Sequence, residues 1–190
     1  MRAFRALFLL LAVLFSMIAW SSKADAYERQ WQASLGLGYA HLSNGGGTAV
    51  QLASLPGFGA SLGLSYGVND ALNIIGHADF SMHPGDTSVL VGGGGVGIAY
   101  VLDIVQWVPW LGLTAGAYGV SIGEPCVSNV SVPCTTGRFG LSLPFGLDYQ
   151  LSRSFSLGAG GRYGLLLFGN QNKLDQTISV FARAQYIWGY

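Results

Sequence analysis

The chain has 190 residues, with nine Lys+Arg and nine Asp+Glu, so its formal net charge is zero. Charged residues are 9% of the sequence, whereas an ordinary soluble domain has about 25%. So few charges would hardly cover a soluble surface, and the balance of charge gives no reason to expect nucleic-acid binding.

The first 26 residues have the features of a secretion signal. Arg2 and Arg5 precede an uncharged, largely apolar run from Ala6 to Trp20, and Ala24-Asp25-Ala26 forms an A-x-A cleavage site. The run is shorter than the ~20 residues of a spanning helix, so a cleaved signal peptide is favoured over a membrane anchor. We expect residues 27–190 to form one mature domain, with six Lys+Arg and eight Asp+Glu.

Apolar and polar residues alternate along most of the mature chain, which is the period of a β-strand. In the first segment, Trp31, Leu35 and Tyr39 share one face with Ala33 and Leu37, while the other face is polar or glycine. Repeating this test predicts eight strands, near residues 30–39, 58–66, 72–80, 88–102, 107–122, 138–149, 155–167 and 176–190.

The fourth and fifth of these strands have the weakest pattern, because the run Gly92–Gly95 hides the alternation and apolar residues occupy both faces. We predict that their outward residues are Val96, Ile98, Tyr100, Leu102, Leu111, Leu113, Ala115 and Ala117. Pro109 is compatible with a position near a strand start but not with a paired strand centre.

The last strand has a wholly apolar face that ends in Tyr186, Trp188 and Tyr190, and an opposite face that carries Arg183. An arginine at a lipid-facing strand centre would cost about 2–4 kcal/mol, so one face is expected to meet lipid and the other water. Phe181 and Ile187 interrupt the polar face. A strand with this aromatic ending resembles the closing strand of bacterial outer-membrane barrels, which implies recognition by the barrel assembly machinery.

The predicted connections alternate between short and long. Short turns are expected at Gly67–Asp70, Asp103–Gln106 and Gln150–Ser154, and longer loops at Leu42–Gly57, Met82–Thr87, Gly123–Thr136 and Gly169–Asp175. With no convincing spanning helix and few charges, this predicts an all-β fold, an eight-stranded antiparallel up-and-down transmembrane β-barrel. We expect a monomer in the lipid and lipopolysaccharide of the bacterial outer membrane, with both termini in the periplasm.

Charged residues of the predicted strands fall on the face away from lipid. They are His77, Asp79, Arg138, Asp148, Arg162 and Arg183. An eight-stranded barrel is just wide enough for side chains to fill, so these residues are expected to form an ion-pair network in the lumen. They would either satisfy one another and hold the barrel shape, or act as a plug against small ions. The spacing of His77 and Asp79 also suits a catalytic dyad, although no nucleophile is assigned to them.

Cys126 and Cys134 lie in the third long loop. In an exported chain they predict a disulfide. A zinc site is the alternative, but two cysteines with no nearby histidine supply only half of its ligands. We expect neither a metal site nor a cofactor.

The segment His41-Leu42-Ser43-Asn44, at the end of the first strand, resembles the His-x-Ser-Asn segment of outer-membrane lipid A deacylase barrels. The resemblance implies Ser43 as nucleophile, His41 as its base and Asn44 as oxyanion donor, and the strand parity would put His41 and Ser43 on the lipid side. That family also uses a glutamate in the following strand, whereas residues 44–66 here contain no acid.

Over the mature length, the pattern resembles the small OmpA/OmpX-type barrels. This resemblance implies structural, adhesive or narrow-pore roles in the outer membrane. We expect a non-catalytic barrel with a largely filled polar lumen and a structural or surface-binding role. The alternatives are a lipid A deacylase-like esterase and a narrow passive pore. No cell-wall-binding domain is expected after residue 190.

Overall fold

Strands make up most of the residues that the computed structural model describes, which are residues 29–43, 55–85, 88–102, 106–122, 135–167 and 175–189. They are β1 (Trp31–Ser43), β2 (Leu55–Gly67), β3 (Leu72–His83), β4 (Val89–Val101), β5 (Trp107–Ile122), β6 (Thr135–Ser152), β7 (Phe155–Leu167) and β8 (Asp175–Trp188). Within these described segments, we find no helix that is long and apolar enough to cross a membrane.

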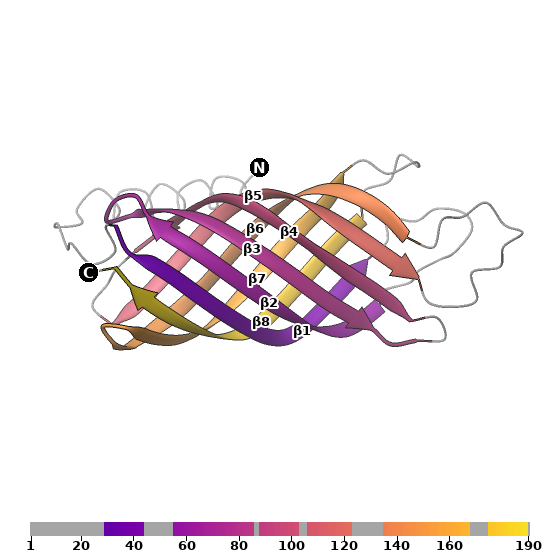
Figure 1. The fold of residues 1–190 in the computed structure, drawn as a ribbon. Coiled ribbons are helices and arrows are strands. Elements are labelled where there is room, and N and C mark those ends of the chain that lie inside the picture. Colours follow the sequence, from indigo (N-terminus) through magenta and orange to yellow (C-terminus); the bar gives the residue numbers. More distant parts are fainter. Residues whose placement is uncertain are drawn as a thin grey trace, which may run out of the picture.

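The strands form one closed sheet, in which each strand pairs with its neighbours in the sequence and β1 also pairs with β8 (Figure 1). The closing pair is antiparallel and runs from Trp31 opposite Trp188 to Ser43 opposite Gln176. Because closure gives every strand two partners, no sheet edge presents a row of unpaired backbone groups. The predicted eight-stranded antiparallel barrel is therefore confirmed.

Side-chain alternation separates an apolar outer wall from the lumen. On β1, Leu35 and Leu37 are 50% and 63% exposed, whereas Gly36 between them is buried. The outward residues predicted for β4 and β5, where the sequence pattern is weakest, are also confirmed. Val96 and Leu111 are among the most exposed residues of the wall. The wall has this composition because small residues fit inside a narrow barrel and large apolar residues are left to the outside.

Phe181 and Ile187, which interrupt the polar face of β8, lie in the lumen and are buried. Ile187 packs with Val101 and Val108 in an apolar cluster near one end of the lumen. A second apolar cluster, of Leu42, Val89 and Val91, lies at the other end. Apolar side chains therefore occupy both ends of the lumen, in addition to the polar residues predicted there.

The strands run alternately toward the two ends of the barrel (Figure 1). We call the end with the turns after β2, β4 and β6 the turn end, and it also holds the start of β1 and the end of β8. Strands β1, β3, β5 and β7 end at the opposite end of the barrel, which we call the loop end. The predicted signal peptide and the residues that would form the disulfide lie outside the described residues.

Several strands extend beyond their predicted limits. β1 continues to Ser43, β2 begins at Leu55 and β3 continues to His83, all within segments predicted as loops. β6 runs to Ser152, so the turn that follows is shorter than the predicted Gln150–Ser154. Backbone pairing continues at these ends because a strand ladder needs only its partner strand, whereas the side-chain pattern that predicts strands fades outside the apolar band.

Candidate functional site

Two charged side chains from opposite walls meet within the lumen. Arg162 of β7 donates through Nη1 to Oδ2 of Asp79 on β3. These strands are four apart in a ring of eight, so the pair, which we call the cross-lumen bridge, spans the barrel. The Asp79 oxygen also lies 3.4 Å from Nε2 of His77, and that nitrogen is 3.3 Å from the Tyr118 hydroxyl. The bridge and these two contacts together connect β3, β5 and β7.

A second polar group lies nearer the turn end. Nε of Arg183 is 3.4 Å from Oδ1 of Asp148, and its guanidinium carbon lies 4.7 Å from the centroid of the Trp110 ring. Arg183 also donates to Gln185, and Nε2 of Gln185 donates to Oε1 of Gln32 at 3.0 Å. Because Asp148 is buried, its pairing with an arginine offsets part of the cost of desolvating the carboxylate.

The cross-lumen bridge lies between two cavities of about 70 Å³ each. Ser61, Arg162 and Phe181 line both cavities. The cavity toward the turn end is also lined by Asp148 and Arg183, and the one toward the loop end by Asp79. Each cavity is large enough for several water molecules, and the bridge forms part of the partition between them.

Glycines make room in the lumen for large aromatic rings. A Cβ atom at Gly93 would lie 2.4 Å from a ring carbon of Tyr118, and one at Gly146 would lie 2.6 Å from the Trp110 ring. These distances are too short for any side chain, so the rings lie directly on the backbone of the neighbouring strands. The inward glycines therefore let aromatic residues fill a lumen that is narrow for them.

The six residues predicted to form the lumen network all lie on strand faces that point inward. The contacts described above divide five of them into two groups, Asp79 with His77 and Arg162, and Asp148 with Arg183. Arg138 lies on β6 closer to the loop end, opposite Tyr118 of β5. Sequence reasoning had no means of choosing which acid pairs with which base.

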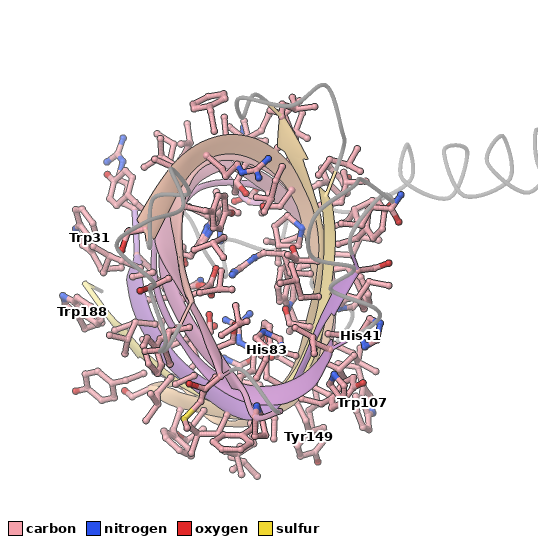
Figure 2. All side chains as sticks on the ribbon, turned by 90° about the vertical axis from the view of Figure 1, so that its right-hand side faces the viewer. Trp31, His41, His83, Trp107, Tyr149 and Trp188 are labelled. Atoms are coloured by element: carbon pink, nitrogen blue, oxygen red, sulfur yellow. The ribbon has the colours of Figure 1, made fainter. Side chains whose placement is uncertain are left out.

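His41 and Ser43, the residues of the deacylase-like segment, lie on the outward parity of β1, as the strand pattern implies. Figure 2, viewed from the loop end, shows His41 on the outer side of the wall and His83 inside the lumen. Nδ1 of His41 is 3.1 Å from the Tyr39 hydroxyl, and the two rings are stacked with centroids 6.2 Å apart. Asn44, the third residue of that hypothesis, lies outside the described residues.

Sequence reasoning missed a pair of polar residues at the loop end of β3. Ser81 Oγ and His83 Nε2 are 3.0 Å apart in the lumen. The signal was present, because Ser81 and His83 continue the inward parity of His77 and Asp79. The strand predicted from the sequence ends near Phe80, whereas β3 extends to His83 and includes the pair.

Within the described part of the chain, no group of three or more His, Cys, Asp or Glu residues is placed to hold a metal ion. Cys126 and Cys134 lie outside that part. The disulfide therefore stays a prediction.

Comparison with solved structures identifies the architecture. Neisserial surface protein A superposes with a TM-score of 0.68 at 18% identity, over 82% of this chain and 96% of that one. The chain has the fold of the small outer-membrane barrels. Ail, the attachment invasion locus protein of Yersinia pestis, gives a TM-score of 0.57 at 14% identity, over 85% of this chain and 99% of its own. The outer membrane protein OprG of Pseudomonas aeruginosa gives 0.53 at 12% identity, over 88% and 100%. No family model and no curated protein matches the sequence.

Proposed function

We propose that this protein is a non-conducting barrel of the bacterial outer membrane with a structural or surface-binding role. The observation that carries the proposal is the cross-lumen bridge, in which Arg162 and Asp79 join opposite walls between the two cavities. Blocking the lumen to ions in this way needs no catalytic residue.

The outer wall supports membrane insertion. Outward apolar residues on β6 extend from Phe139 to Tyr149, and the ten steps between them, at about 3.3 Å each and tilted by about 40°, span about 25 Å. This matches the apolar band of outer-membrane barrels. Toward the turn end the wall has outward aromatic pairs, Trp31 with Tyr66 and Trp107 with Tyr149, each with ring centroids 4.9 Å apart. Trp and Tyr are typical of the membrane–water interface.

The charges of the cross-lumen bridge support the proposal that ions cannot pass through the lumen. A passing ion would have to separate Arg162 from Asp79 in a lumen whose side chains are largely shielded from solvent, with exposures of 10% and 25% for this pair. Separating the two charges in this partly shielded site would be unfavourable, because each would lose its partner. Aromatic rings of Tyr118 and Phe181 narrow the same level of the lumen. This argues for the barrier over the narrow passive pore that the sequence also allows.

A surface-binding role would belong to the segments at the loop end, and their composition limits the partner. Residues 44–54, 84–88, 123–134 and 168–174 contain one cation, Lys173, and two acids, Asp86 and Glu124. Ail has been solved with the heparin analogue sucrose octasulfate, a polyanion that basic side chains would recognise. We therefore propose an uncharged partner for this protein and do not carry polyanion binding over to it.

The remaining partners follow from the barrel itself. We propose that the protein is a monomer, that its outer wall contacts membrane lipid and lipopolysaccharide, and that the assembly machinery recognises β8. Closure of the sheet between β1 and β8 supports the monomer, because no open edge is left for a second copy to pair with.

Conductance across planar bilayers tests the barrier. We expect no steady conductance from the wild-type protein, and measurable conductance from Arg162→Ala, which removes the side chain that crosses the lumen. Arg153→Ala is the matched control, since Arg153 lies in the turn between β6 and β7. Steady wild-type conductance, or an Arg162→Ala protein that inserts and stays silent, would contradict the proposal.

A further inference from the structure

Ser81 and His83 form a hydrogen-bonded pair that takes no part in the proposed barrier. Ser81 Oγ lies 3.0 Å from Nε2 of His83, and Nδ1 of the same ring lies 2.9 Å from the carbonyl oxygen of Leu55. A carbonyl oxygen only accepts hydrogen bonds, so Nδ1 must carry a proton. In a neutral ring Nε2 is then the acceptor, and the Ser81 hydroxyl donates to it. This is the arrangement of a serine with its general base.

The surrounding strands hold the imidazole in place. His83 is 2% exposed and lies opposite Val89 of β4, which is completely buried. On the other side, a Cβ atom at Gly57 of β2 would lie 2.6 Å from His83 Nδ1. The ring therefore fits into a space that exists because residue 57 has no side chain. Packing fixes its orientation and leaves Nε2 directed at Ser81.

Open space lies in front of the serine. Ser81 and His83 both line the cavity toward the loop end. The residue opposite Ser81 on β2 is Gly59, and a Cβ atom there would lie only 3.2 Å from Ser81 Cβ. Because Gly59 has no side chain, the serine is not covered from that strand. Figure 2 shows the ring of His83 reaching into the lumen as seen from the loop end.

We propose that Ser81 is a nucleophile activated by His83 and that it accepts the acyl group of small, uncharged esters entering from the loop end. Ser81 Oγ bonds to the ester carbonyl carbon while its proton moves to His83 Nε2. The bond between the acyl carbon and the alcohol oxygen then breaks, and the alcohol leaves with that proton. Water hydrolyses the acyl-serine by the same proton route, releasing the acid and restoring Ser81.

The backbone carbonyl of Leu55 occupies the place that a carboxylate has in a catalytic triad. It orients the ring but brings no negative charge to stabilise the imidazolium that forms. Disturbing the carboxylate of a serine-protease triad lowers turnover by about 10⁴-fold, so we expect slow turnover here. Covalent labelling is therefore a better assay than product formation. The activity would add to the barrier role and does not depend on it.

An alkyl fluorophosphonate probe tests this pair. Ser81 Oγ would bond to phosphorus, the phosphorus–fluorine bond would break, fluoride would leave and His83 would take the proton. Intact-mass analysis and peptide mapping of the folded wild-type protein should show one adduct, located on Ser81. Loss of the base should slow labelling by at least about 100-fold in His83→Gln, while Ser156→Ala, which removes a buried serine at the turn end, should label like the wild type.

Gly59→Ala supplies a second test that leaves the histidine intact. Its methyl group would occupy the space in front of Ser81, so labelling should be slower by at least about tenfold. The gel mobility of each unboiled variant checks that the barrel has formed. An absence of adduct on Ser81 in the wild type, or equal labelling of wild type and a folded His83→Gln, would overturn the inference. The barrier would then still stand or fall by its conductance.

Discussion

Replacing Arg162 with glutamine removes the cation of the cross-lumen bridge and leaves Asp79 as a carboxylate without that partner in the lumen. Loss of one partner from a buried pair typically costs about 3–5 kcal/mol. Asp79 is 25% exposed and lines a cavity that can hold water, so we reduce the expected loss of unfolding free energy to about 2–3 kcal/mol. Asp79→Asn should cost a similar amount, because it leaves the Arg162 charge behind.

The double variant Arg162→Gln/Asp79→Asn should lose less than the sum of the two single variants. Two neutral amides can hydrogen-bond to each other or to water, so the coupling energy should be about 1–2 kcal/mol. Urea unfolding in lipid vesicles, followed by tryptophan fluorescence and by the gel mobility of unboiled samples, measures the unfolding free energy of each variant. Arg153→Gln, in an exposed turn, should change the unfolding free energy by less than about 0.5 kcal/mol.

If the double variant lost as much unfolding free energy as the two single variants together, this reasoning would be refuted. That result would show that the two charges do not interact across the lumen. Losses below about 0.5 kcal/mol in both single variants would refute it as well, since exposed ion pairs contribute that little. Either outcome would also weaken the proposed barrier, which depends on the same contact.

The same unfolding assay tests the two faces of the wall. Gly146→Ala should lose about 1–3 kcal/mol, because its methyl group would meet an indole ring at 2.6 Å, whereas Gly137→Ala has nothing within 4 Å and should be neutral or slightly stabilising. Leu37→Arg, at a 63% exposed site inside the apolar band, should lose about 2–4 kcal/mol, and Leu151→Arg near the turn end about 0–1; equal losses would argue against a bilayer around the band. Mass spectrometry of lipid A from cells expressing the wild type or Ser43→Ala should give identical patterns, and a difference would support the deacylase hypothesis.

The alternation of apolar and polar residues is enough to determine the barrel. A strand has a period of two, so the outward residues of β1, such as Leu35 and Leu37, follow from sequence alone. Closure follows from the number of strands and from the need of every backbone group for a partner in lipid. Even in β4, where the glycine run hides the pattern, Val96 and Ile98 have the predicted parity. The ends of strands are less predictable, because pairing there continues without the pattern.

For the lumen, the sequence predicts which residues face inward but not which of them pair with each other. The sequence puts Asp79, Asp148, Arg162 and Arg183 on the inward face but does not say how the strands meet around the ring. Only closure brings β3 opposite β7, and only the registers set the heights at which Arg162 reaches Asp79 and Arg183 reaches Asp148. Pairing across a barrel joins residues far apart in the chain, and no local period encodes it.

The same limit explains the two features that the sequence hid. Phe181 and Ile187 look like errors in an alternating strand, yet in the closed barrel they are lumen residues, and Phe181 lies against glycines of the neighbouring β1 and β7. The serine and histidine at the end of β3 become a directed pair only because a β2 carbonyl fixes the imidazole tautomer. Local periodicity thus decides which side of the wall a residue faces. Its partner there is decided by the curvature and register of the whole sheet, which exist only in the folded barrel.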